Sequence, residues 1–137
     1  MHEMSLIGDV IRVVERYAKE NDAERVVAVN LVIGEMRDVV DRLLDSCFAY
    51  LSRGTVAEGA ALNVRKIPLR PRCVQCHTVF RAEPRKPEQL VCPRCGSRNL
   101  SMYEGGEFFI ANIEVVWNRA TRPARPPGRK EMIRYGF

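Results

Sequence analysis

Two segments of the chain place apolar residues at the three- and four-residue spacing of an amphipathic helix. The first covers residues 5–20, with Ser5 as a candidate N-cap. The second covers residues 39–53, follows a candidate cap at Asp38, and ends before Gly54, which suits the left-handed position beyond a helix. We expect the second helix to bury an apolar stripe made of Val40, Leu43, Leu44, Cys47, Phe48 and Leu51.

Three other segments favour β-strands, namely residues 24–33, 61–67 and 108–117. The last of them alternates apolar residues on one face: Phe109, Ala111, Ile113, Val115 and Trp117. Because this strand is long and apolar, we expect it to return to the main sheet beside residues 61–67. The pattern therefore predicts the α+β class, with a small three-stranded sheet and two helices.

Two Cys-x-x-Cys pairs lie between the second and third predicted strands. Cys73 and Cys76 form the first pair, and Cys92 and Cys95 follow after fifteen residues. Two tight turns that each present two thiolates can surround one Zn²⁺ as a tetrahedron, so we predict a zinc ribbon. The alternatives are disulfides or a redox Cys-x-x-Cys motif, but a redox motif needs one pair within a thioredoxin-like context. The fifth cysteine, Cys47, is interpreted as a small core residue.

The predicted elements divide the chain into three parts. Residues 1–68 and 107–117 form an α/β domain, and a zinc-ribbon domain, residues 69–106, is inserted between two of its strands. Residues 118–137 contain three prolines and six basic residues, so we expect a basic tail that is poorly ordered.

The net charge of +5 is spread unevenly along the chain. Residues 118–137 carry +5, residues 65–98 carry +7 and residues 1–64 carry −4. A basic zinc ribbon can contact nucleic acid or dock an acidic partner protein. A zinc-ribbon nucleic-acid-binding factor is therefore an alternative function. We do not favour it, because Phe80 is the only aromatic residue for base stacking between residues 65 and 98.

Length and composition narrow the class of protein. The 137 residues, 46% of them hydrophobic, suffice for one or two small packed domains. No apolar run reaches the roughly 18 residues of a membrane span, and no signal-peptide pattern is visible. We therefore expect a cytoplasmic protein with no membrane partner. We do not expect an enzyme, because the sequence contains no nucleophile–base arrangement, no phosphate loop and no open zinc position.

The amino terminus, Met1-His2-Glu3, is a second candidate metal site. The terminal amine, the first backbone nitrogens and the His2 imidazole lie within chelating reach of one ion. Nitrogen donors in a plane suit Ni²⁺ or Cu²⁺ better than Zn²⁺. The alternative is that His2 is a solvated or core histidine. The only other histidine, His77, follows the first cysteine pair and is interpreted as a surface imidazole.

Several stretches together resemble one protein family. They are the start Met-His-Glu-Met-Ser-Leu, the strand end Ile33-Gly34-Glu35, the segment Gly54-Thr55-x-Ala57-Glu58-Gly59-Ala60, both cysteine pairs, and the strand Ile113-Glu114-Val115. In this order, over residues 1–117, they are similar to the HypA family of accessory proteins, which insert nickel into nickel–iron hydrogenases.

The resemblance implies a two-domain nickel metallochaperone. It assigns transient Ni²⁺ cargo to Met1, His2 and Glu3, through the His2 imidazole and nearby backbone nitrogens. It assigns structural Zn²⁺ to the four cysteines Cys73, Cys76, Cys92 and Cys95. It also implies two partners, a HypB-type GTPase and the hydrogenase large subunit, and in some organisms urease as a further client.

The sequence departs from the family pattern in two places. Some members carry a histidine shortly after the second cysteine pair that ligates nickel, whereas this chain has Arg98, and a guanidinium cannot act as a ligand. The remaining donor would then be another backbone nitrogen, a carboxylate such as Glu3, or another group, with His77 as a further candidate that no pattern supports. After Glu35 the chain reads Met-Arg-Asp-Val where a different turn sequence is common. The sequence is also compatible with a homodimer formed by domain swapping.

Overall fold

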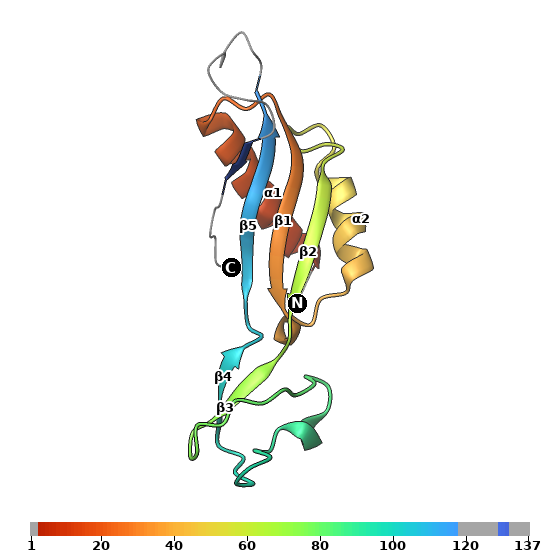
Figure 1. Ribbon diagram of the computed structural model, residues 1–137. Coiled ribbons are helices and arrows are strands. Elements are labelled where there is room, and N and C mark those ends of the chain that lie inside the picture. Colours follow the sequence, from red (N-terminus) through yellow and green to blue (C-terminus); the bar gives the residue numbers. More distant parts are fainter. Residues whose placement is uncertain (1–2, 118–128, 132–137) are drawn as a thin grey trace. The chain divides into compact units, whose positions relative to one another are not determined.

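The computed structural model describes residues 3–117 and 129–131 (Figure 1). Its chain falls into two compact units. The helix–sheet unit comprises residues 1–31, 39–64 and 109–137, and the ribbon unit comprises residues 32–38 and 65–108. The elements are α1 (Glu3–Glu20), β1 (Arg25–Gly34), η1 (Glu35–Arg37), α2 (Asp41–Leu51), β2 (Ala61–Ile67), β3 (Arg70–Cys73), η2 (Pro87–Gln89), β4 (Leu100–Glu104), β5 (Phe108–Val116) and β6 (Arg129–Glu131). The predicted α+β class is confirmed, whereas the predicted domain boundaries stay a prediction.

The main sheet has the strand order β2-β1-β5-β6. The prediction that residues 108–117 lie beside residues 61–67 is therefore wrong, because β1 lies between them. Burial explains this order: β1 buries most of its side chains and suits the centre, whereas β2 alternates with exposed residues and suits an edge. Hydrogen bonds from the Glu24 N–H to the Val116 carbonyl (2.9 Å) and from the Gly34 N–H to the Glu107 carbonyl (2.7 Å) make β1 and β5 antiparallel.

A fourth strand, β6, was not predicted from the sequence. It comes from the basic tail and pairs antiparallel with β5, so that Ile113, Glu114 and Val115 lie opposite residues 131, 130 and 129. The rest of the tail, residues 118–128 and 132–137, lies outside the described residues. Within the described residues, no helix is long and apolar enough to cross a membrane.

Both helices begin at residues other than the predicted caps. Ser5 lies inside α1, which already starts at Glu3. Asp38 does not cap α2; Val40 holds that position, in an extended conformation. Asp38 instead adopts a left-handed conformation (φ 47°), and its carboxylate accepts a hydrogen bond of 2.6 Å from Arg85. This hydrogen bond and the charge of Arg85 lower the pKa of Asp38. The Asp38 carboxylate therefore pairs with Arg85, 47 positions along the chain, and does not cap the nearby start of α2.

The core of the helix–sheet unit lies where α1 packs across the sheet, and α2 packs against α1 (Figure 1). Its most deeply buried side chains are Ile7, Val10, Val14, Val29, Leu31, Leu44, Ile110, Ile113 and Val115. The predicted apolar stripe of α2 is only partly correct, because Leu44 and Phe48 are buried whereas Val40 and Leu43 are 40% and 43% exposed. Cys47 is half-buried.

The alternation predicted for the last strand changes phase along its length. Ile113, Val115 and Trp117 are buried as predicted, but Phe108 and Ile110 are buried in place of Phe109 and Ala111. The phase changes between Ile110 and Ile113, inside the helix–sheet unit, where Ala111 and Asn112 are both half-buried. A single period of two cannot represent a strand whose alternation shifts along its length.

The turn after β1 is held by close backbone contacts within the ribbon unit. The Met36 N–H donates to the Gly105 carbonyl (2.9 Å), and Arg37 Nε donates to the Gly106 carbonyl (2.8 Å). A Cβ added at Gly34 would collide with the Gly105 carbonyl. Gly34 is therefore needed so that the two backbones can approach each other.

Gly105→Ala is expected to destabilise the protein by about 1–3 kcal/mol, because the residue has a positive φ of 116° and its new Cβ would meet the Leu69 Cα at 2.7 Å. Gly59→Ala is a matched control: φ is 76°, but no atom lies within 4 Å of the added Cβ. Urea unfolding of both variants measures the difference. A smaller loss for Gly105→Ala than for Gly59→Ala would contradict this account.

Candidate metal centre

The two cysteine pairs sit on turns with the same backbone hydrogen bonds. The first cysteine of each pair accepts a bond of 2.9 Å at its carbonyl, from the N–H of His77 in one turn and of Gly96 in the other. The N–H of the first cysteine donates to the carbonyl of Thr78 or Ser97, again at 2.9 Å. His77 and Gly96 are both left-handed, with φ of 64° and 76°. The two turns therefore present their sulfurs in equivalent ways.

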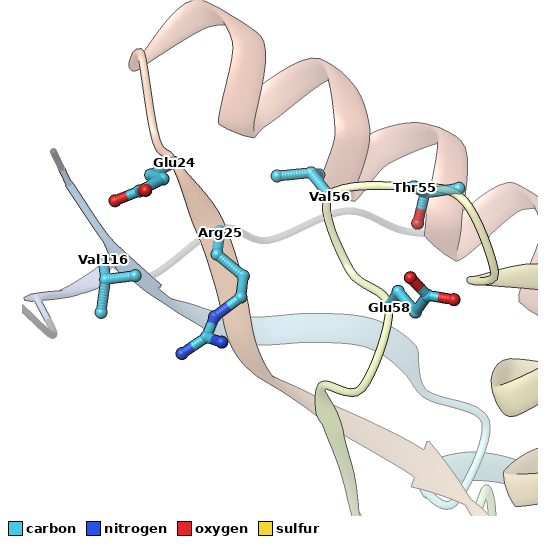
Figure 2. Close-up of a pocket in the computed structure, with 6 residues that line it drawn as sticks. All are labelled: Glu24, Arg25, Thr55, Val56, Glu58 and Val116. Atoms are coloured by element: carbon cyan, nitrogen blue, oxygen red, sulfur yellow. The ribbon is translucent and has the colours of Figure 1, made fainter.

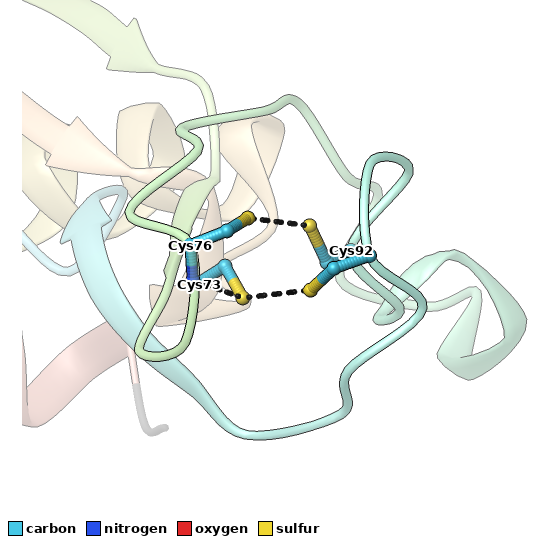
Figure 3. Close-up of side chains that lie close together, drawn as sticks. Cys73, Cys76 and Cys92 are labelled. Atoms are coloured by element: carbon cyan, nitrogen blue, oxygen red, sulfur yellow. Dashed lines mark hydrogen bonds between the residues drawn. The ribbon is translucent and has the colours of Figure 1, made fainter.

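The four cysteine sulfurs lie close together in one cluster. Figure 3 shows three of these residues, Cys73, Cys76 and Cys92, with their side chains pointing toward one another. Sγ of Cys73 lies 3.5 Å from Sγ of Cys95, and Sγ of Cys76 lies 3.5 Å from Sγ of Cys92. All four ligand atoms lie within 4.8 Å of one another. A tetrahedral zinc site with Zn–S bonds of about 2.3 Å has sulfur–sulfur edges of about 3.8 Å, so the cluster fits a closed four-thiolate site.

The disulfide alternative does not match this geometry. A disulfide requires sulfurs at about 2.05 Å, whereas all five cysteines of the described residues are free thiols. The close sulfur–sulfur contacts also join one Cys-x-x-Cys pair to the other. A redox motif consists of a single pair and does not require such contacts. The predicted zinc ribbon is therefore the interpretation that the arrangement supports.

The polar groups around the cluster favour thiolates. Sγ of Cys76 lies 3.1 Å from Oγ1 of Thr78, and a hydroxyl that donates to the thiolate lowers the pKa of Cys76 to about 6. For Cys95, the Ser97 backbone N–H favours the thiolate, but the neighbouring Cys73 sulfur and burial outweigh it and raise the pKa to about 12. Without a cation, four adjacent sulfurs cannot all ionise. A divalent metal ion removes that repulsion, so this donor set suits a resident dication.

His77→Gly is expected to stabilise the metal-loaded ribbon by up to about 1 kcal/mol. The left-handed conformation costs a residue with a Cβ roughly 1–2 kcal/mol, and the freedom of glycine in the unfolded chain offsets part of that gain. The reverse change, Gly96→His, is expected to destabilise the second turn by a similar amount. Urea unfolding with zinc in excess measures both. If His77→Gly instead weakened metal retention while Gly96→His did not, the exposed imidazole would have a role in the centre.

The amino-terminal candidate site is described only in part. Met1 and His2 lie outside the described residues, so their predicted role as nickel ligands stays a prediction. Glu3 opens α1, and its carboxylate accepts a hydrogen bond of 3.3 Å from the N–H of Val40. This bond joins the start of α1 to the start of α2, and it places the Glu3 carboxylate at the surface of the helix–sheet unit.

The Gly-Thr-x-Ala-Glu-Gly segment has a structural role in the helix–sheet unit. Oγ1 of Thr55 donates to the Ser52 carbonyl (2.6 Å) and accepts from the Ala57 N–H (3.1 Å). The Val56 carbonyl accepts from the Val26 N–H (3.0 Å), which fastens the segment to β1. The segment borders an open hollow of about 520 Å³, shown in Figure 2, whose lining includes the exposed side chains of Glu24 and Glu58.

The family comparison covers most of the chain. The family model described as "Hydrogenase/urease nickel incorporation, metallochaperone, hypA" matches residues 1–115. The hydrogenase maturation factor HypA of Dehalococcoides mccartyi strain CBDB1 is 40% identical over 115 residues, which are 84% of this chain and 94% of the relative. HypA of Streptomyces avermitilis is 35% identical over 132 residues, covering 96% of this chain and 99% of the relative, so that match includes most of the basic tail.

The solved structures agree with the sequence relatives. The solution structure of the Ni metallochaperone HypA from Helicobacter pylori superposes with a TM-score of 0.61 at 26% identity. The superposition covers 86% of this chain and all of the other. The fold, the four-cysteine cluster and the match from residue 1 therefore lead to one conclusion: this chain belongs to the HypA family of hydrogenase/urease nickel-incorporation metallochaperones.

Proposed function

We propose that this protein binds Ni²⁺ at its amino terminus and delivers it to the large subunit of a nickel–iron hydrogenase during maturation. The observation that carries the proposal is the family match, which begins at residue 1 and so includes Met1-His2-Glu3. The terminal amine, backbone nitrogens and the His2 imidazole supply the nitrogen donors that Ni²⁺ accepts in a plane. The Glu3 carboxylate or another backbone nitrogen completes the set, because Arg98 cannot ligate a metal.

A terminus with one imidazole suits cargo that must be released. Amine, amide and imidazole nitrogens all lose protons when they bind a metal, so protons compete with Ni²⁺ at every donor. The four-cysteine site is of a different kind, because it is closed and rich in thiolates. We propose that it holds Zn²⁺ as a resident structural ion at Cys73, Cys76, Cys92 and Cys95, and that nickel does not exchange through it.

The proposed partners follow from the family. A HypB-type GTPase would supply or accept nickel, and the hydrogenase large subunit would receive it, in the cytoplasm and with no reaction catalysed by this chain. Nucleic acid is not proposed as a ligand, because two arginines of the ribbon unit already have carboxylate neighbours: Arg70 lies 3.2 Å from Glu104 and Arg81 lies 3.7 Å from Glu35. These carboxylates would repel a phosphate backbone.

Transfer of nickel tests the proposal directly. Zinc-loaded protein carrying one Ni²⁺ is mixed with apo large subunit in the presence of a competing chelator. We expect faster nickel incorporation than from the same concentration of free Ni²⁺, and further acceleration by the GTPase with GTP. If nickel incorporation with this protein is no faster than with the same concentration of Ni²⁺ and chelator alone, the proposal that the protein delivers nickel to hydrogenase is wrong. The same assay with apo urease distinguishes the two clients.

A further inference from the structure

Helix α2 carries more apolar surface than the core of the helix–sheet unit uses. Leu44 and Phe48 face inward and are buried. A second line of side chains stays at the surface, and we call it the outer stripe: Val40, Leu43, Cys47 and Tyr50. Val40, Leu43 and Tyr50 are 40%, 43% and 57% exposed, and Cys47 is half-buried. Exposed apolar groups that line up along one helix mark an interaction surface more often than scattered ones.

The spacing of the outer stripe matches a helix–helix seam. Its helical members, Leu43, Cys47 and Tyr50, follow one another after four and three residues, which is the a/d spacing of a heptad, and Val40 precedes them at the N-cap. The inward residues Leu44 and Phe48 follow a different line, about 100° around the helix from the stripe. The outer stripe is therefore not an extension of the packing against α1, and it presents a ridge for one further helix.

The side of the outer stripe turned away from the core is basic. Helical spacing places Arg42 there, and Arg53 follows in the turn after the helix. Neither forms an ion pair with a carboxylate among the described residues. The Arg53 guanidinium lies over the Tyr50 ring, 4.3 Å from its centre, and its Nε donates to the Tyr50 carbonyl at 3.3 Å. The guanidinium thus covers one face of the Tyr50 ring and brings a positive charge to that end of the outer stripe.

The outer stripe begins beside Glu3, which is one of the proposed nickel ligands. The Val40 N–H donates to the Glu3 carboxylate at 3.3 Å, and the next residue of α1, Met4, is 49% exposed. A protein that lies along α2 would therefore reach the start of α1, where cargo has to be passed on. This step of the argument rests on the proposed function.

We propose that the outer stripe docks an amphipathic helix of a protein that takes part in nickel transfer, with an apolar ridge at heptad spacing and an acidic edge facing Arg42 and Arg53. A second copy of this chain fits less well, because it would set its own basic edge against the same two arginines. Helix α2 has 11 residues, about 16 Å of axis, so the contact is short. A short contact gives a weak and transient complex, as delivery requires.

Two synthetic helical peptides test the proposal on the full-length, zinc-loaded protein. Both carry leucine at heptad positions a and d, but one has glutamate and the other lysine on the flanking positions. We expect the glutamate peptide to shift backbone NMR signals of residues 40–53 and to bind at least about tenfold more tightly than the lysine peptide. Leu43→Asp should weaken binding by about tenfold or more. Val74→Asp, at another apolar residue that is 46% exposed but lies in the ribbon unit, should leave it unchanged.

The double variant Arg42→Glu, Arg53→Glu tests the basic edge separately from the apolar ridge. We expect it to reverse the preference, so that the lysine peptide binds more tightly. Equal binding of both peptides, or full binding by Leu43→Asp, would overturn the proposal. So would a concentration-dependent dimer of the wild-type chain that crosslinks through Cys47, because a second copy would then occupy the outer stripe.

Nickel titration of the same variants separates this proposal from the proposed function. Leu43→Asp should bind Ni²⁺ like the wild type. If the peptides fail to bind while nickel binding persists, only the docking surface is wrong. If the glutamate peptide binds but the wild type takes up no nickel, the docking surface stands and nickel delivery is wrong.

Discussion

Removal of the metal from the four-cysteine cluster is expected to unfold the ribbon between residues 69 and 106. Among its residues only Leu69, Pro71, Cys73, Ala82, Cys92 and Gly105 are buried, and two of these are proposed metal ligands. Such a small core cannot hold about 40 residues against their conformational entropy. A structural zinc ion contributes roughly 10–16 kcal/mol of apparent binding free energy, and in a small metal domain that energy is folding energy.

Cys92→Ser tests this expectation together with chelation. We expect one zinc per chain in the wild type by elemental analysis, and a loss of bound zinc in the variant. The amide signals of residues 69–106 should collapse to the shifts of an unfolded chain, whereas those of α1, whose buried residues Ile7, Val10 and Val14 belong to the other unit, should stay dispersed. Cys47→Ser is the matched control, because Cys47 lies outside the cluster and its loss should leave zinc in place. A Cys92→Ser protein with full zinc content and a folded ribbon would refute the assigned site.

The features that the sequence predicted correctly depend on short-range spacing. The two cysteine pairs each close a five-residue turn, and residues that stand so close along the chain have few ways to arrange their sulfurs. The helices and strands likewise follow from local periodicity. The predicted bounds of β2 match the structure, and those of α1, α2, β1 and β5 differ from it by one or two residues at an end.

The features that the sequence missed depend on distant partners. Asp38 has the chemistry of a helix cap, but Arg85, 47 residues away, holds its carboxylate. Strand β1 lies between β2 and β5 because it buries side chains on both of its faces. Burial on both faces arises only in the assembled sheet, so a local pattern does not reveal it. No local pattern marks residues 129–131 as a strand either, because a three-residue strand is defined by the edge of β5 that it pairs with.

The outer stripe of α2 shows a third kind of limit. From the sequence, six apolar residues of this helix form one stripe and are expected in the core. The structure divides them, because packing against α1 buries Leu44 and Phe48 and leaves Val40 and Leu43 exposed. Periodicity identifies which residues share a helix face, but it does not say how much of that face the rest of the chain covers.

His2→Ala is expected to lower the affinity for Ni²⁺ by at least about 100-fold, because losing a direct ligand should exceed the 10–100-fold cost of losing a group that only orients one. Isothermal titration of untagged, zinc-loaded protein measures the effect, and intact mass establishes that Met1 is retained. His77→Ala is the matched control at the only other histidine of the chain. It should bind nickel like the wild type, because the imidazole of His77 belongs to an exposed turn of the ribbon unit.

A single glycine added before Met1 distinguishes a terminal chelate from an ordinary histidine site. The added residue converts the α-amine of Met1 into an amide and moves the new amine away from the imidazole by one residue, while every side chain of the protein is kept. We expect a loss of affinity comparable to that of His2→Ala, with zinc content unchanged. Wild-type affinity should also fall as the pH drops below about 6.5, because protons then compete for the imidazole. Full nickel binding by the extended protein would remove the amine from the site and leave His2 to act with other donors.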